Sequence, residues 1–194
     1  MNVYDNLLPV DGEVFFFPAF FNESESDHYY KALLQQIAWK QEPIIIFGKE
    51  VMQPRLTAWY GDEGKSYRYS GITMQPEHWT EALLEIKQRI EIIAGVSFNS
   101  ALLNRYRDGH DSMGWHADDE RELGTNPVIA SVSLGATRRF RMKHLASKET
   151  LAIDLTDGSL LVMAGTTQHH WQHAIPKTKL EVGERINLTF RWTT

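Results

Sequence analysis

The chain has 194 residues, of which 42% are hydrophobic and 23% charged, as is usual for a single globular domain. It has no cysteine, which excludes disulfides, thiolate zinc sites and cysteine nucleophiles and favours a reducing cytoplasm. The net charge of −5 excludes the overall basic field common in nucleic-acid binders, so a nucleic-acid partner would need a local basic patch.

The first predicted element is a buried strand over residues 14 to 21, an apolar run that is short and interrupted by Pro18. No apolar run is long enough to span a bilayer, and no signal-peptide pattern opens the chain. We therefore expect a cytoplasmic monomer, nuclear if the source is eukaryotic, with no membrane partner. A helix is predicted next over 24 to 39, with Ser24 and Ser26 as N-cap candidates.

A second helix is predicted from Pro76, a favourable first-turn residue, to a stop at Gly95. The region before it, 40 to 75, is less regular and rich in aromatic residues. After Gly95 the chain changes to short strands separated by turn residues, and we predict strands at 97–106, 128–134, 138–144, 151–155, 159–164 and 185–192. This pattern indicates a mixed α+β fold, with a sandwich or jelly-roll core buttressed by helices on one side.

The last predicted strand has two different faces, because side chains alternate along a strand. Its apolar face belongs in a core and consists of Ile186, Leu188, Phe190 and Trp192. Its polar face carries two guanidiniums, an amide and a hydroxyl, from Arg185, Asn187, Thr189 and Arg191. Such a row suits an anion site of fixed geometry, although an ordinary solvent-exposed strand has the same pattern.

Two histidines and one carboxylate are candidate metal ligands. His116 and Asp118 are two residues apart, and His173 follows about fifty residues later within a histidine-rich cluster. Two histidines and a carboxylate are the facial triad of non-haem iron(II) oxygenases, although zinc can use the same ligands. For His110, His169 and His170 we expect ordinary turn or surface roles.

An iron(II) ion with these ligands keeps a net positive charge and can chelate an anionic co-substrate. The polar strand begins twelve residues after His173, so the chain can return beside the metal. Asn104 and Tyr106, on one face of another predicted strand, could add an amide and a phenol. Each charge-assisted bond is worth roughly 1.5–3 kcal/mol, so two or three would hold a small dicarboxylate.

With these elements the chain resembles the AlkB family of iron(II)- and 2-oxoglutarate-dependent nucleic-acid demethylases. The matching motifs are Asn104-Arg105-Tyr106, His116-x-Asp118, His173 and Arg185-x-Asn187-x-Thr189-x-Arg191. The likeness runs from about residue 44 to the C-terminus. Segments that resemble the branch acting on double-stranded DNA are Ile46-Phe47-Gly48-Lys49, Pro54-Arg55, Tyr60-Gly61-Asp62, Tyr67-Arg68-Tyr69-Ser70-Gly71 and Asp118-Asp119-Glu120-Arg121-Glu122-Leu123.

The resemblance implies one dioxygenase domain over 1–194 with a double-stranded β-helix (jelly-roll) core at 96–194. Residues 1–43 would be an N-terminal extension and first helix, 44–75 a nucleotide-recognition lid, and 76–95 a buttressing helix. Iron(II) would be bound by His116, Asp118 and His173, and 2-oxoglutarate by Asn104, Tyr106, Arg185, Asn187, Thr189 and Arg191. With O2, such an enzyme demethylates bases such as 1-methyladenine or 3-methylcytosine and releases formaldehyde, succinate and CO2.

The aromatic region 40 to 75 suits a base-handling lid. Flipping a base costs a few kcal/mol, and stacking on an aromatic ring returns roughly 1–3 kcal/mol per base. Tyr67 and Tyr69 share a strand face and could sandwich a flipped base, while Phe47 could fill the gap left in the stack. The other expected substrate contacts are Gly48, Lys49, Arg68, Asp119 and Glu120.

Three alternatives remain open at the level of sequence. The stretch between His173 and Arg185 carries only a thin basic patch, Lys177 and Lys179, so single-stranded DNA or RNA competes with duplex DNA as the substrate. A second alternative is a 2-oxoglutarate oxygenase acting on a protein or a small molecule, which would use the same iron and co-substrate residues. The third is a non-catalytic binding module, which has no need of a complete metal triad.

Overall fold

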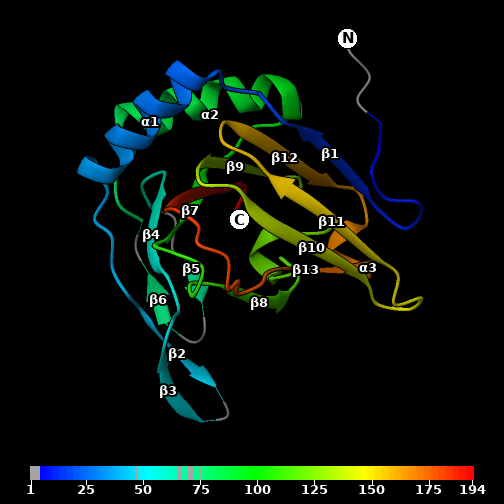
Figure 1. Cartoon of the computed structure of the whole chain (residues 1–194). Coiled ribbons are helices and arrows are strands. Elements are labelled where there is room, and N and C mark those ends of the chain that lie inside the picture. Colours follow the sequence, from blue (N-terminus) through cyan, green and yellow to red (C-terminus); the bar gives the residue numbers. More distant parts are fainter. Residues whose placement is uncertain (1–4, 47, 65–66, 70–71, 75) are drawn as a thin grey trace.

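The computed structural model describes residues 5–46, 48–64, 67–69, 72–74 and 76–194, and for residues 45, 46, 67–69 and 72–74 it describes the backbone alone. Two antiparallel sheets form the core (Figure 1). The larger has the order β1 (Glu13–Phe17), β12 (Ser159–Ala164), β9 (Ile129–Gly135), β14 (Arg185–Arg191), β7 (Ser100–Tyr106) and β4 (Leu56–Gly61). The smaller has the order β11 (Thr150–Leu155), β10 (Arg138–His144), β13 (Trp171–Ile175) and β8 (Met113–His116).

Two hairpins and three helices complete the described part of the chain. The hairpins are β2 (Pro43–Ile46) with β3 (Lys49–Met52), and β5 (Tyr67–Tyr69) with β6 (Ile72–Met74). The helices are α1 (Glu23–Gln36), α2 (Glu81–Ala94) and the single turn α3 (Thr167–His170), with one further 3-10 turn at Arg121–Leu123. No helix among the described residues is both long enough and apolar enough to cross a membrane. The predicted jelly-roll core with buttressing helices is confirmed.

The first helix begins earlier than the sequence predicts. Asn22 is its N-cap: the Asn22 side chain accepts a hydrogen bond from the backbone N–H of Glu25, and the Glu25 carboxylate accepts one from the backbone of Asn22. This reciprocal capping box satisfies two backbone donors that a helix start otherwise leaves free. Ser24 and Ser26 as N-caps are therefore wrong, and Ser26 is instead buried, where its hydroxyl donates to Asp157.

The second helix begins later than predicted. Its N-cap is Thr80, whose side chain accepts a hydrogen bond from the backbone N–H of Leu83, so Pro76 as a first-turn residue is wrong. The segment after Pro76 is extended because Glu77 pairs with β4: its N–H donates to Trp59 at 2.9 Å and its carbonyl accepts from Gly61 at 3.1 Å. The predicted stop is confirmed, since Gly95 takes the left-handed conformation that ends a helix readily.

The larger sheet is covered on both faces. On its outer face, α1 and α2 lie side by side (Figure 1), and Leu33, Leu83 and Ile90 pack against Ile186 and Leu188. A second apolar cluster fills part of the space on the inner side of the sheet and includes Tyr106, Phe140, Met142, Leu161 and Trp171. A strand between two such clusters is removed from water on both sides.

Two ends of predicted strands differ from the structure. β1 stops at Phe17, before Pro18, because proline has no N–H to continue the ladder with β12. β14 stops at Arg191, so the expectation that Trp192 packs in the core is wrong: that side chain is 51% exposed. The chain leaves the sheet there because Thr193 turns back to donate its N–H to Asn99.

Candidate functional site

Strand β14 is buried at all seven positions, between β7 and β9 in the middle of the larger sheet. Its apolar face meets the helices, and its polar face lines a pocket on the inner side of the sheet. Solvent exposure of the polar face is therefore excluded. Two guanidiniums buried on one strand require charge partners, because transferring an ion out of water costs several kcal/mol of free energy.

The three candidate metal ligands meet at this pocket. His173 on β13 is the direct cross-strand partner of His116 on β8, and Asp118 follows two residues after β8 ends. One Asp118 oxygen, Oδ1, lies 4.0 Å from His116 Nε2, and the other, Oδ2, lies 3.9 Å from His173 Nε2. One ligand atom from each residue lies within 4.8 Å of the others. Since metal–ligand bonds are about 2.0–2.2 Å, small rotations of these side chains suffice to bind one ion.

Neighbouring groups orient these ligands. The ring nitrogen Nδ1 of His116 lies 2.9 Å from the carbonyl of Gly114, which accepts its proton and leaves the Nε2 lone pair facing Asp118. The backbone N–H of Asp118 donates to Gln168 Oε1 at 2.9 Å, and Arg191 Nη2 donates to Asp118 Oδ1 at 2.6 Å. The sequence motifs indicated Arg191 but gave no signal for Gly114 or Gln168.

The electrostatics match a metal site. Burial, reinforced by the nearby His116, lowers the pKa of His173 to about 3, so the imidazole is neutral and has a free lone pair. Burial alone would raise the pKa of Asp118, but the charge of the Arg191 guanidinium and its hydrogen bond to Oδ1 oppose burial, and the pKa lies below its usual value. The carboxylate is therefore ionised. Neutral imidazole and ionised carboxylate are the forms that bind a divalent cation.

Arg185 is the least compensated charge in the pocket. Its side chain is buried, and Nη2 donates to Ser133 Oγ at 2.8 Å. Within the described part of the chain, Nε and Nη1 have no hydrogen-bond partner. The guanidinium lies 5.2 Å from the ring centroid of Tyr106, and burial lowers its pKa to about 10. A buried cation with unused donors is well suited to bind a ligand carboxylate.

The polar residues between the two arginines hold one another in place. Asn187 Nδ2 donates to Ser131 Oγ at 2.8 Å, and its Oδ1 accepts from Thr189 at 3.1 Å and from Asn104 at 3.4 Å. Asn104 Oδ1 in turn accepts from Arg55 Nε at 2.7 Å. Arg55 is itself buried, and it was not among the predicted site residues.

All nine predicted metal and co-substrate residues line the same pocket: Asn104, Tyr106, His116, Asp118, His173, Arg185, Asn187, Thr189 and Arg191. Apolar side chains that sequence reasoning missed form much of the remaining wall, among them Leu102, Met113, Phe140, Leu155 and Met163. A pocket with a few convergent polar groups among apolar walls is the usual form of a small-molecule site.

The predicted substrate contacts are less fully described. Gly48 and Lys49 are exposed at the β2–β3 hairpin, which extends away from the two sheets (Figure 1). Asp119 is exposed and Glu120 half-buried, directly after Asp118. Phe47 lies outside the described residues, as do the side chains of Tyr67, Arg68 and Tyr69, whose backbone forms β5. The roles of these residues stay predictions.

Comparisons with known proteins agree with this geometry. The family model described as 2OG-Fe(II) oxygenase superfamily matches residues 13–191. Alpha-ketoglutarate-dependent dioxygenase alkB homolog 3 of Rattus norvegicus is 44% identical over 201 residues, covering 97% of this chain and 68% of that protein. DNA oxidative demethylase ALKBH2 of Homo sapiens is 38% identical over 182 residues, covering 88% of this chain and 70% of that protein.

A solved structure supports the fold. The structure of OsALKBH1 superimposes with a TM-score of 0.67 and covers 95% of this chain and 99% of that one, at 18% sequence identity. The sequence relatives and the match over most of the chain carry the family assignment, and the ALKBH2 relatives support the expected likeness to the branch acting on double-stranded DNA. The chain belongs to the 2OG-Fe(II) oxygenase superfamily and, within it, to the AlkB family of iron(II)- and 2-oxoglutarate-dependent dioxygenases.

Proposed function

We propose that this protein oxidatively demethylates N-alkylated bases in DNA, such as 1-methyladenine and 3-methylcytosine. The observation that carries the proposal is that the two-histidine, one-aspartate cluster and the uncompensated Arg185 line one pocket. Neither feature alone specifies an oxygenase. Together they provide for a metal and for an anionic co-substrate beside it.

His116, Asp118 and His173 would bind iron(II), and the bound iron would supply activation of O2. Three protein ligands leave coordination positions for a co-substrate and for oxygen. Arg191 donates to Asp118 Oδ1 and keeps that carboxylate ionised and oriented. Arg191 would therefore position Asp118, one of the three metal ligands.

Arg185 would bind a carboxylate of 2-oxoglutarate through its Nε and Nη1 donors. Ser133 fixes the guanidinium from the other side by accepting from Nη2, so its orientation is set before the ligand arrives. Tyr106 lies beside the guanidinium, while Asn104, Asn187 and Thr189 form the hydrogen-bonded floor of the pocket. Such preorganisation lowers the entropy lost on binding.

The overall reaction balances with these two co-substrates. A base carrying an N-methyl group, 2-oxoglutarate and O2 yield the base with N–H, formaldehyde, succinate and CO2. One oxygen atom enters succinate and the other enters the methyl group, whose hydroxymethyl product releases formaldehyde. The apolar side chains of Leu102, Phe140 and Met163 line the pocket beside the metal ligands and would limit access of water to this step.

Two further observations support a nucleic-acid substrate. The relatives reported above include proteins named DNA oxidative demethylase. Two basic groups also lie beside an exposed aromatic ring: on β8 and β10, the half-exposed Trp115 has Lys143 Nζ 4.7 Å and the Arg141 guanidinium 6.0 Å from its ring centroid. Basic groups beside an exposed aromatic ring suit the phosphates and bases of an unpaired strand. Residues 44–75 would act as the lid over the base.

The test is a formaldehyde and succinate assay with iron(II), 2-oxoglutarate and three matched oligonucleotides that carry 1-methyladenine: single-stranded DNA, duplex DNA and RNA. We expect product from DNA, and equimolar formaldehyde and succinate. The control pair is Asp118→Ala, which should lose turnover, and Asp154→Ala, an exposed aspartate on β11 that should retain it. Product from RNA alone would move the assignment to RNA. Succinate formation driven by a peptide or small molecule, without formaldehyde from any oligonucleotide, would overturn the nucleic-acid proposal.

A further inference from the structure

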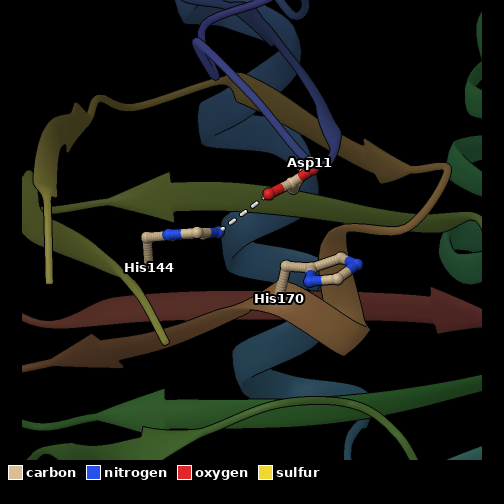
Figure 2. A group of neighbouring side chains, drawn as sticks. All are labelled: Asp11, His144 and His170. Carbon is tan, nitrogen blue, oxygen red and sulfur yellow. Dashed lines mark ion pairs between the residues drawn. The ribbon is translucent and has the colours of Figure 1, made fainter. Parts of the chain in front are cut away.

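A second cluster of two histidines and one aspartate lies apart from the iron site. Asp11 precedes β1, His144 ends β10 and His170 ends α3, so three separate elements contribute (Figure 2). One ligand atom from each residue lies within 4.8 Å of the others. We propose that this cluster is a binding site for a divalent transition metal, with zinc as the metal that its chemistry fits best. The sequence pattern had indicated only an ordinary surface role for His170.

His144 is the anchor of the cluster. The residue is 5% exposed, and its ring packs against Trp171 with ring centroids 4.9 Å apart. Its Nε2 lies 3.2 Å from Asp11 Oδ2 (Figure 2), yet within the described structure this nitrogen makes no hydrogen bond. A buried imidazole nitrogen that faces a carboxylate without a hydrogen bond is suited to share a metal ion with it.

The turn that carries Asp11 is fixed without any metal. Asn6 Oδ1 accepts the backbone N–H groups of Leu8 and Val14 at 3.1 and 2.8 Å, and Trp171 Nε1 donates to the carbonyl of Val10 at 3.1 Å. Asp11 itself takes a left-handed backbone conformation, φ 52°, which aspartate tolerates better than most residues. The fold therefore holds the Asp11 carboxylate beside His144, and metal binding would require little further ordering of this turn.

The hydrogen bonds of His144 allow metal binding after one proton shift. Nδ1 accepts a hydrogen bond from the backbone N–H of Ser147 at 3.1 Å and lies 2.9 Å from the Ser147 hydroxyl oxygen. A metal on Nε2 requires the proton on Nδ1, so the bond from the Ser147 N–H would be replaced by one that Nδ1 donates to Ser147 Oγ. Metal-bound histidines usually have this arrangement: one ring nitrogen binds the metal and the other donates a hydrogen bond to an oxygen.

The ligand types select the metal. Calcium and magnesium prefer all-oxygen sites, whereas two imidazoles and one carboxylate suit zinc and its neighbours. In a tetrahedral zinc site the ligand atoms are about 3.4 Å apart, given bonds of about 2.0–2.2 Å. Asp11 and His144 already meet this spacing. His170 is exposed, and a rotation of its ring closes the remaining gap, with water as the fourth ligand.

A bound zinc ion would connect three elements at one end of the smaller sheet. It would join the N-terminal turn to β10 and to the residue that directly precedes β13, the strand that carries His173. His170 and His173 are three residues apart, about 10 Å along an extended chain, so the two metals would occupy separate sites. The expected effect is stabilisation of the fold, because a ligand that binds only the native state raises its stability.

The test separates the two sites by metal stoichiometry. Equilibrium dialysis of the full chain against zinc, followed by metal analysis, should give two zinc ions per wild-type chain. The double variant His116→Ala/Asp118→Ala should retain one, and adding His170→Ala to it should reduce this to none or weaken the zinc affinity at least tenfold. His169→Ala, an exposed histidine next to the cluster, is the matched control and should retain one.

Two additional measurements guard against a folding artefact. In the double-variant background, zinc should raise the thermal unfolding midpoint, and Asp11→Asn, an exposed position, should remove that rise while leaving the metal-free midpoint and circular dichroism unchanged. Cobalt(II) in place of zinc should give the intense visible absorption of a tetrahedral site. Failure of the double variant to bind zinc, or unchanged binding after His170→Ala, would overturn the proposal. Neither result bears on iron-dependent demethylation.

Discussion

Replacing Arg185 with methionine tests the co-substrate site most directly. Methionine has a similar length but no charge and no donors, so the substitution removes the carboxylate partner without leaving a large cavity. The side chain is buried and makes one hydrogen bond, to Ser133. Since Nε and Nη1 have no other hydrogen-bond partner in the described structure, their loss should be felt mainly when 2-oxoglutarate is bound.

The magnitude follows from the hydrogen bonds lost. Each hydrogen bond to a charged group contributes about 1.5–3 kcal/mol, and 1.4 kcal/mol is a factor of ten. Arg185→Met should therefore weaken 2-oxoglutarate binding by roughly 10- to 150-fold even if only one such bond is lost. The KM for the methylated oligonucleotide should change little, because Arg185 lies within the buried pocket.

The unliganded protein should respond in the opposite way. A buried guanidinium without a carboxylate partner costs free energy, so its removal should leave the unfolding midpoint of the metal-free, ligand-free protein unchanged or raised. Saturating 2-oxoglutarate should raise the midpoint of the wild type but not that of the variant.

The assay is anaerobic calorimetric binding of 2-oxoglutarate with manganese(II) in place of iron, combined with succinate formation at varied 2-oxoglutarate. Arg139→Met is the matched control, because Arg139 is exposed on β10 and pairs with Asp154. A co-substrate affinity within twofold of wild type in Arg185→Met would refute the assignment. Equal losses in co-substrate and oligonucleotide affinity would assign Arg185 a structural role.

Three further predictions concern the metal, the lid and the second helix. Asp118→Ala should abolish iron-dependent turnover, as measured by formaldehyde release, and normal activity in that variant would refute the metal assignment. Replacing Tyr67 and Tyr69 with alanine should raise the KM for the methylated oligonucleotide severalfold, while calorimetric 2-oxoglutarate binding stays within twofold; unchanged oligonucleotide kinetics would remove the lid role. Thr80→Ala should lower the free energy of unfolding by about 1 kcal/mol through loss of an N-cap, and an unchanged urea midpoint would contradict that role.

Much of the site could be read from the sequence because its chemistry is concentrated in short segments. Alternation along 185–191 separates the residues that face the helices from those that face the pocket, and the structure has the same division. His116 and Asp118 are adjacent enough to identify as a pair. They meet His173 only because β8 pairs with β13. The spacing of the candidate metal ligands in the sequence suggests that these segments come together but does not say which strands pair.

The supporting contacts could not be read in the same way, because they join residues far apart in the chain. Arg55 supports Asn104, Ser133 supports Arg185, and the Gln168 side chain accepts the N–H of Asp118. Serine and glutamine are common residue types, and nothing local distinguishes Ser133 and Gln168 from other copies, while the Pro54-Arg55 segment carried a family likeness but indicated no role for Arg55. β4 was missed for a related reason: its positions after Leu56 are all buried, so the alternation typical of a half-exposed strand is absent.

The two errors at helix starts have a different cause. Local preference favours Pro76 in a first turn, but the backbone of Glu77 is used for pairing with β4, which requires an extended chain. At α1 the serines were plausible caps, but Asn22 precedes them and can pair with Glu25. The start of α2 is determined by the pairing of Glu77 with β4, and the start of α1 by Asn22, which is the stronger N-cap.

The cross-strand position of His116 and His173 has a consequence for the edge of the smaller sheet. β8 is an edge strand whose one partner in that sheet is β13, and the register between them shifts after His173. A slip of one residue would turn His116 away from the pocket and bring Trp115 in. An ion bound by both histidines would therefore hold β8 in register with β13, where the pairing is short and irregular. Amide exchange in residues 113–116 should then slow when metal binds, because the metal centre also keeps β8 aligned with β13.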